Sequence, residues 1–246
     1  HDLYVLSPYL GVAGAAILVI LLDLVIKRKD LLPGFALLGL APPLVLSLIQ
    51  AFDLEDSVNL LRGADPLSTE QASILLGSLS VDRFALFFNF LVLATSGPVI
   101  LTSTGYVRRM ERFQGEYYGL ILFSATGMML LAAATELITI YIALELATLP
   151  LAALSAFLMN SKSSEAGIKF LIIGAISSAI MLYGMALIFG FSGSTKLSEI
   201  SASVAAGSGG LSSANYALLV GVVLMVVGFG FKISSAPFQM WVPAVY

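Results

Sequence analysis

Four ionisable residues lie inside long apolar stretches of this 246-residue chain: Asp23, Glu145, Lys169 and Lys232. A charged side chain at bilayer depth costs about 2.5 to 3.5 kcal/mol on insertion scales, so such residues mark functional sites or buried pairs. Burial and a neighbouring charge shift the pKa of carboxylates and amines in general. A glutamate and a lysine whose separation changes can therefore take up and release protons. The residue types predict proton-transfer chemistry.

Glu145 lies eight residues from the start of an apolar run over 137–158, where reaching water is difficult. Pro150 follows and removes the backbone donor that the carbonyl of Leu146 would use in a regular helix. This locally polar point can hold water beside the carboxylate. The alternative is a buried structural ion pair. Against it, replacing such a pair by apolar residues is often neutral or stabilising, so stability alone gives little reason to keep one.

Lys232 follows an apolar or small-residue stretch from Ala214 to Phe231 and precedes ISSAPFQMWVP. Gly228, Gly230 and Pro237 flank it, which predicts loss of regular helical hydrogen bonding within 229–238. Broken helices at membrane depth are tolerated where they line protein or a water-filled cavity. The alternative is a lysine that only caps carbonyls at the break.

Lys169 lies close to the start of the apolar run 167–190, so its stem can also snorkel to the interface. Ser177 and Ser178 lie deeper in the same run and could bind water along a hydrated path. Asp23 precedes Lys27 by four residues at the end of the first run, which favours an interfacial ion pair.

The composition identifies the environment of these groups. Hydrophobic residues make up 59% of the chain and charged residues 11%, against roughly a quarter charged in soluble domains. The mean hydropathy is +0.98. These values indicate an integral membrane protein and exclude a soluble enzyme, a nucleic-acid binder and a disordered chain.

Cofactor chemistry has little support in the sequence. The chain has no Cys, and its single His is residue 1, so neither a thiolate nor an intramembrane histidine is available as a metal or haem ligand. No glycine-rich phosphate-binding motif is present, which argues against nucleotide binding or hydrolysis.

Apolar runs separated by charged or turn residues predict an all-α, polytopic transmembrane helix bundle with a discontinuous helix near 229–238. Seven spans are expected, at 8–26, 32–52, 82–103, 117–134, 137–158, 167–190 and 214–243. The connection 53–80, with a short apolar patch at Ile74, Leu75 and Leu76, is expected to lie at a membrane surface. The Gly- and Ser-rich connection 191–213 is expected to hold a short amphipathic helix around 196–206.

The distribution of cations predicts the orientation. With the N-terminus outside, the inner loops carry Lys27, Arg28, Lys29, Arg108, Arg109, Arg112 and Lys162, whereas the outer loops carry Arg62 and Lys196. Residues 27–30, 104–116 and 159–166 are then expected to face the cytoplasm.

Three blocks of the sequence are YIALELATLPLAAL, SSEAGIKFLIIGAISSAIMLYGMALIFGFSGST and GFGFKISSAPFQMWVPAVY. Together they closely resemble consecutive blocks of the N subunits of proton-pumping NADH-quinone oxidoreductase, respiratory complex I, within the antiporter-like subunit family. The resemblance covers roughly residues 117–246, and residues 1–116 fit in helix count and general character.

The resemblance implies a fold of fourteen transmembrane helices with two inverted five-helix repeats, of which this chain corresponds to the N-terminal half. Residues 1–116 would be three leading helices with the outer loop 53–80, and residues 117–246 most of the first repeat. By resemblance, Glu145 matches the glutamate of helix five, Lys169 the lysine of helix six, and Lys232 the lysine at the break of helix seven. Family members bind no redox cofactor themselves, since NADH, flavin, iron–sulfur clusters and quinone belong to partner subunits.

Two positions depart from the family pattern. Gln239 stands where a histidine usually follows the Pro-Phe of the break, and Ala244 stands where an aspartate usually follows the proline. Both departures remove a polar contact but leave Glu145, Lys169 and Lys232 in place.

The expected function is therefore proton translocation by an antiporter-like subunit of complex I, driven by remote quinone reduction. Its expected partners are the lipid bilayer and the other membrane subunits, with protons, or sodium in their place, as the transported ion. Its expected location is the bacterial plasma membrane. The alternatives are a subunit of a multisubunit cation/proton antiporter or of a membrane-bound hydrogenase, and a non-transporting membrane scaffold.

Overall fold

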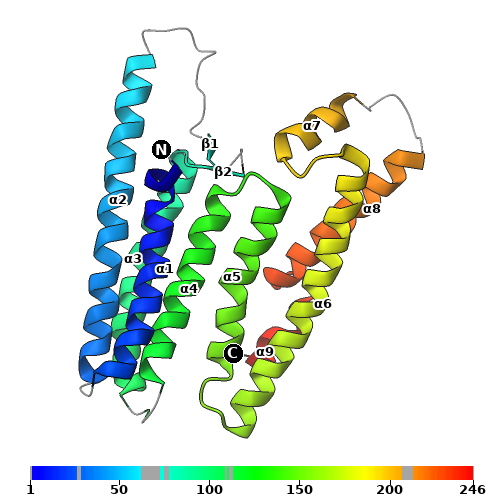
Figure 1. Ribbon diagram of the computed structural model, residues 1–246. Coiled ribbons are helices and arrows are strands. Elements are labelled where there is room, and N and C mark those ends of the chain that lie inside the picture. Colours follow the sequence, from blue (N-terminus) through cyan, green and yellow to red (C-terminus); the bar gives the residue numbers. More distant parts are fainter. Residues whose placement is uncertain are drawn as a thin grey trace. The chain divides into compact units, whose positions relative to one another are not determined.

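A computed structural model of the chain describes residues 2–26, 29–61, 73–74, 78–108, 110, 113–206 and 213–245. Six helices are long and apolar enough to cross a membrane: α1 (Asp2–Val25), α2 (Leu32–Leu61), α3 (Arg83–Val107), α4 (Gln114–Ala133), α5 (Leu137–Ser155) and α6 (Ser161–Ser192) (Figure 1). The shorter elements are η1 (Lys29–Leu31), α7 (Leu197–Ala206), α8 (Ser213–Lys232), η3 (Gln239–Trp241) and α9 (Val242–Val245). The predicted all-α membrane fold is confirmed.

The expected seventh span is divided. Regular helix begins at Ser213 and ends at Lys232, and the residues that follow form turns, η3 and α9 instead of a continuous helix. The apolar run over 214–243 is therefore not one straight helix, and its length overstates the helical part. The physical reason is the Gly and Pro content around Lys232 that predicted the interruption.

The first of two compact units comprises residues 1–134 and 142–151. Within it, α1 packs against α2 and α4, and α3 packs against α2 and α4, so these four helices form a bundle (Figure 1). Its core holds fully buried side chains such as Val12, Leu122 and Met129. The buried Asn89 amide donates to the Tyr9 hydroxyl at 3.3 Å, which gives a polar group inside the bundle a partner.

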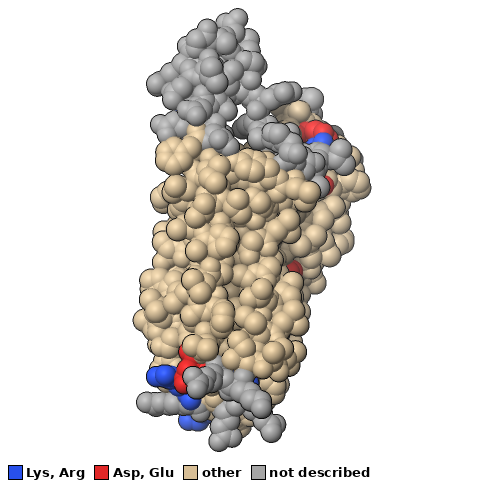
Figure 2. All heavy atoms as spheres, turned by 60° about the vertical axis from the view of Figure 1, so that its left-hand side comes forward, with Lys and Arg blue, Asp and Glu red and all other residues tan. Residues whose placement is uncertain are grey.

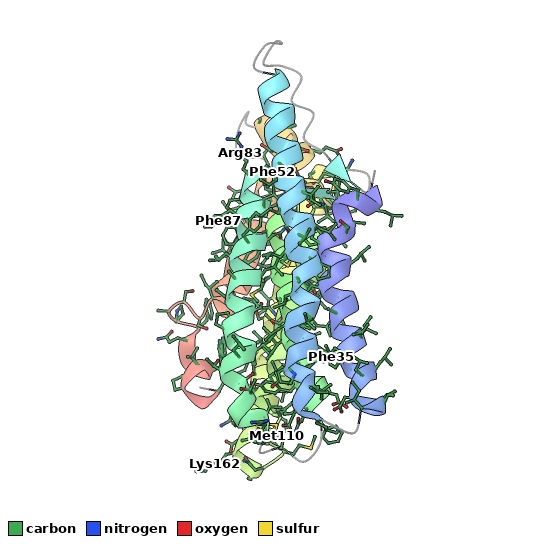
Figure 3. All side chains as sticks on the ribbon, turned by 90° about the vertical axis from the view of Figure 1, so that its left-hand side faces the viewer. Phe35, Phe52, Arg83, Phe87, Met110 and Lys162 are labelled. Atoms are coloured by element: carbon green, nitrogen blue, oxygen red, sulfur yellow. The ribbon has the colours of Figure 1, made fainter. Side chains whose placement is uncertain are left out.

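The outer surface of this bundle suits a bilayer. Figure 2 shows uncharged side chains along the length of the helices on the face toward the viewer, with charged side chains at the lower end. Figure 3 shows Phe52 of α2 and Arg83 of α3 at one end of the bundle, and Phe35 of α2 and Met110 at the other. The two helices therefore run antiparallel, as membrane spans joined by one loop must.

Ion pairs form where α1 ends and α2 begins. The Lys29 ammonium lies 3.0 Å from the carboxylate of the buried Asp23, and the exposed Arg108 and Asp30 pair at 2.9 Å. The sequence predicted an interfacial ion pair for Asp23, and the structure has one. Its partner is Lys29, six residues away across the helix end, whereas Lys27 lies outside the described residues.

A glycine brings the middle of α5 against α4. A Cβ atom at Gly127 would lie 2.3 Å from the backbone nitrogen of Ala147 and 2.8 Å from the carbonyl oxygen of Ala143. Only a residue without a side chain fits there. Small residues at helix interfaces are the general means of close packing in membranes, where the hydrophobic effect does not drive helices together.

The second unit comprises residues 135–141 and 152–246. In it, α6 packs along α8 and also contacts α7, η3 and α9. The side chain of Asn160 caps α6 by accepting from the Ser163 amide at 2.8 Å, and Gly193 ends the helix in the left-handed conformation at φ 72°. Both are ordinary helix-end signals.

The two long connections hold short elements. In 53–80, α2 continues to Leu61, and two-residue strands β1 (Ser73–Ile74) and β2 (Leu79–Ser80) pair antiparallel, with Ile74 opposite Leu79. The other two residues of the predicted apolar patch, Leu75 and Leu76, lie outside the described residues. In the second connection, α7 confirms the short helix predicted around 196–206.

The close approach at Gly127 gives the first prediction. Gly127→Val should lower the thermal stability of the full-length protein in its membrane complex by about 1 to 3 kcal/mol or prevent assembly, because the new side chain meets backbone atoms that cannot rotate away. Gly97→Val is the matched control, since a Cβ atom at Gly97 has nothing within 4 Å. Equal losses of thermal stability in Gly127→Val and Gly97→Val would show that α4 and α5 do not approach closely at Gly127.

Candidate functional site

The helix interruption predicted around Lys232 is confirmed. The helix α8 ends at this residue, and Ser234 takes the left-handed conformation at φ 56°. The carbonyl of Gly230 accepts from the Ser235 amide at 2.9 Å and from the Ser235 hydroxyl at 3.2 Å. The carbonyls freed at the break thus find donors within the protein, as membrane depth requires.

The end of α8 is also tied to α6. The buried Ser177 hydroxyl donates to the carbonyl of Gly228 at 3.0 Å. A Cβ atom at Gly228 would lie 2.5 Å from the Cβ of Met181, so the two helices are in close contact there. Ser177, which the sequence suggested as a water ligand, uses its hydroxyl to hold α8.

Lys232 itself is half-buried at the end of α8, in the described part of the second unit. It is preceded by Phe231 and followed by the exposed Ile233. Its position at the interruption agrees with the expectation. Its role in proton transfer stays a prediction.

Lys169 lies near the start of α6 and is exposed. Its ammonium pairs with the Glu165 carboxylate one turn earlier at 2.5 Å, and both side chains are about half exposed, at 48% and 61%. An exposed pair at a helix start is typical of an interfacial position. This placement agrees with the snorkelling alternative and leaves a role in proton exchange with the aqueous side open.

Glu145 is half-buried in the middle of α5. Two contacts with α4 flank it: the Gly127 approach and a hydrogen bond from the buried Ser124 hydroxyl to the carbonyl of Ala147 at 2.8 Å. The backbone that carries the carboxylate is therefore held firmly. Glu145 belongs to the first unit and the two lysines to the second, so its expected approach to Lys232 stays a prediction.

Sequence reasoning missed two features of the second unit. Glu136 accepts from the hydroxyl of Thr195 at 2.5 Å, while the Leu137 amide donates to the Thr195 carbonyl at 2.9 Å, which joins the starts of α5 and α7. Trp241 packs beside α6, stacked on Phe170. A lone Trp in a broken segment was a signal for the second contact, but nothing in the sequence identified its partner.

Other features of the described residues offer no competing site. They contain no group of three or more His, Cys, Asp or Glu side chains that could hold a metal ion. A groove of about 530 Å³ lies between α3 and α4. Its only polar side chain, Thr95, donates its hydroxyl to the Leu91 carbonyl at 2.9 Å, so the groove presents apolar surface. The groove is lined by Phe84, Phe88, Leu91, Val92, Thr95, Met128, Leu131 and Ala132.

Residues 134–246 match the family described as NADH:quinone oxidoreductase/Mrp antiporter, TM. NADH-quinone oxidoreductase subunit N of Dehalococcoides mccartyi is 36% identical over 241 residues, which is 97% of this chain and 46% of that protein. Subunit N of Trichlorobacter lovleyi is 48% identical over 170 residues, 69% of this chain and 34% of that protein. The chain thus spans about half the length of the curated relatives it matches, or less.

Solved structures show the same relationship. A chain of respiratory complex I from Thermus thermophilus superposes with a TM-score of 0.68 at 28% identity, covering 97% of this chain and 47% of that one. The Mrp complex from Dietzia has a chain with a TM-score of 0.71 at 18% identity, covering 98% and 43%, which is a likeness of fold alone.

The described residues form helices long and apolar enough to span a membrane, and the region that matches the antiporter family contains the break at Lys232, so the chain is an antiporter-like membrane subunit. Within that class, it is a homologue of NADH-quinone oxidoreductase subunit N.

The tie between α6 and α8 gives the second prediction. Ser177→Ala should destabilise the end of α8 by about 1 kcal/mol, because the buried Gly228 carbonyl loses a donor. Hydrogen exchange of the backbone amides of 229–235 in the full-length protein should become faster. Ser192→Ala is the control, since the Ser192 hydroxyl donates to Ile188 of its own helix. Unchanged exchange in Ser177→Ala would contradict the role of the bond.

Proposed function

We propose that this chain forms part of a proton-translocating, antiporter-like subunit of complex I, in which Glu145, Lys169 and Lys232 pass protons through internal water. The observation that carries the proposal is the helix interruption at Lys232, which lies within the region that matches the family. Complex I is proposed because the relatives named above at 36% and 48% identity are subunits N of NADH-quinone oxidoreductase.

Lys232 acts as the central titrating group. The carbonyls of Gly228, Gly230 and Phe231 accept hydrogen bonds from serine, backbone and Trp241 donors, so they do not depend on the ammonium as a cap. Donors other than the ammonium thus stabilise the break at which Lys232 lies. Its position at the end of a broken helix gives the ammonium room to change partners.

Glu145 supplies the countercharge that biases Lys232. The Ser124 and Gly127 contacts fix its backbone, so any change in the pair comes from the two side chains, from the break at Lys232 or from internal water. Lys169 exchanges protons with the aqueous side. Its exposed pairing with Glu165 supports a position at the interface, where uptake or release takes place.

The remaining parts of the proposal concern the whole assembly. Residues 1–116 provide leading helices, and residues 117–246 most of the first antiporter-like repeat. The N-terminus lies outside. Quinone reduction in partner subunits, which hold NADH, flavin and iron–sulfur clusters, drives the cycle at a distance, and protons are the transported ion.

A second candidate is a subunit of a multisubunit cation/proton antiporter. The family description covers Mrp antiporters, and the fold is shared with the Mrp complex from Dietzia. The two candidates differ in partners and energy source, not in local chemistry. Identification of the subunits that co-purify with the full-length protein separates them: a flavin and iron–sulfur arm supports complex I, and its absence from an intact, active assembly supports the antiporter.

The third prediction tests the relay by mutation in the full complex. Lys232→Ala should sharply reduce proton pumping while assembly is retained, because the titrating group is lost and the apolar packing is largely kept. Glu145→Gln keeps the size of the side chain but removes its charge and should also reduce pumping. Lys169→Ala should give a milder loss. Pumping is measured as protons translocated per NADH oxidised in sealed vesicles.

The double variant distinguishes a relay from a structural pair. If the pair were only structural, removing one partner would cost about 3 to 5 kcal/mol, and Glu145→Gln with Lys232→Met would restore assembly and pumping together. Restored pumping in that variant would falsify the relay, because no protonatable group remains at either position.

The fourth prediction concerns orientation. Cysteines introduced at Ser103 or Ser161 in the full-length protein should react with a membrane-impermeant maleimide only from the cytoplasmic side, because the cation-rich loops are expected there. The 246 residues contain no native Cys to compete within this part of the subunit. Labelling from the opposite side would reverse the topology.

A further inference from the structure

The indole of Trp241 makes contacts next to both lysines of the second unit. Its Nε1–H donates to the carbonyl of Phe231 at 3.3 Å. Its ring stacks on Phe170 of α6, with centroids 4.7 Å apart and planes inclined by 8°. Phe231 immediately precedes Lys232, and Phe170 immediately follows Lys169. One buried side chain therefore joins the backbone beside one lysine to the helix that carries the other.

We propose that Trp241 is a positioning residue that holds the break at Lys232 against the Lys169 segment of α6 through its contacts with Phe231 and Phe170. We call these three residues the Trp241 clamp. The role of the clamp rests on the proposed proton relay. The geometry of the clamp is given by the Trp241 contacts with Phe231 and Phe170.

The residue type fits this role. The indole N–H is a donor only, so it suits a carbonyl at a helix end, and the flat ring offers area for stacking. A phenylalanine could stack but not donate, and a serine could donate but not stack. The Phe231 carbonyl also accepts from the Ser234 amide at 3.1 Å, so the indole adds the donor that comes from beyond the turn.

The turn around the clamp is compact. The ring of Phe238 lies 4.8 Å from that of Phe231, and a Cβ atom at Gly230 would be 3.2 Å from Phe238. These contacts fold the chain after Lys232 back on the end of α8. The Ser177 bond to Gly228 holds α8 on one side of the lysine, and the clamp holds it on the other. The break is thus fixed to α6 at two points.

A relay needs this arrangement because proton transfer between groups depends on their spacing and on the water between them. Without the clamp, the break would keep the Ser177 bond and the Gly228–Met181 packing on the helical side but lose its ring contact with Phe170 beyond the turn. Lys232 would then sample a wider range of positions relative to Lys169. Loss of the clamp should therefore impair coupling more than it impairs folding.

Two variants separate the parts of the clamp in the full complex. Trp241→Phe keeps the ring and removes the N–H, and Phe170→Leu removes the stack and keeps the N–H. Phe170→Tyr is the conservative variant that should preserve function. Phe189→Leu is the matched control, because Phe189 is an exposed aromatic of the same helix.

Spin labels on cysteines at Ile168 and Ile233, two exposed positions beside the lysines, report the spacing directly. Trp241→Phe and Phe170→Leu should broaden the distance distribution and lower the protons pumped per NADH in each assembled complex. Phe170→Tyr and Phe189→Leu should match the wild type. If Trp241→Phe fails to assemble, the proposal is tested by comparing the distance distributions and the protons pumped per NADH of Phe170→Leu and Phe170→Tyr.

Three results would count against the proposal. Unchanged distances in Trp241→Phe and Phe170→Leu would overturn the clamp. Broadened distances with an unchanged pumping ratio would show a structural contact without a positioning role. A Lys232→Ala variant that pumps normally would overturn the relay itself, whereas loss of pumping in Lys232→Ala together with wild-type distances in both Trp241→Phe and Phe170→Leu would overturn the clamp alone.

Discussion

A backbone carbonyl at membrane depth has no water to bond, so each one freed from a helix needs a donor within the protein. This constraint governs the segment after Lys232. The protein meets it with local donors from Ser234 and Ser235 and with a distant donor from Trp241. Those partners stabilise the interruption at whose edge Lys232 lies.

Close helix packing provides the second condition for the site. Lipid chains are as apolar as leucine, so helices in a membrane associate through small residues and interhelical hydrogen bonds. Gly127 and Ser124 hold the part of α5 that carries Glu145, and Gly228 and Ser177 hold the end of α8. The same pairing of a glycine with a serine bond occurs in each unit. It fixes the backbone beside each charged residue while leaving the charged side chain itself half-buried.

Much of the fold could be predicted because its signals are local. Apolar runs predicted seven spans, six of which the described residues form as helices long enough to cross a membrane. Gly and Pro predicted the interruption of the seventh, and the Gly- and Ser-rich connection was expected to hold the short helix α7. Contacts between distant residues could not be predicted in this way. Asp23 pairs with Lys29, which lies beyond the end of α1 at Val25, so the four-residue spacing of a helix does not identify this partner. The partner of Trp241 depends on how α6 lies along the break, which no local pattern specifies.

The central claim is that Glu145 and Lys232 act on one proton path. A cryo-electron microscopy map of the full complex that resolves side chains and internal water tests it most directly. The account predicts that the carboxylate and the ammonium face the same protein-enclosed space at similar depth, joined directly or through polar groups and water. A map in which either side chain faces lipid, or in which a dry apolar layer separates the two, would contradict it.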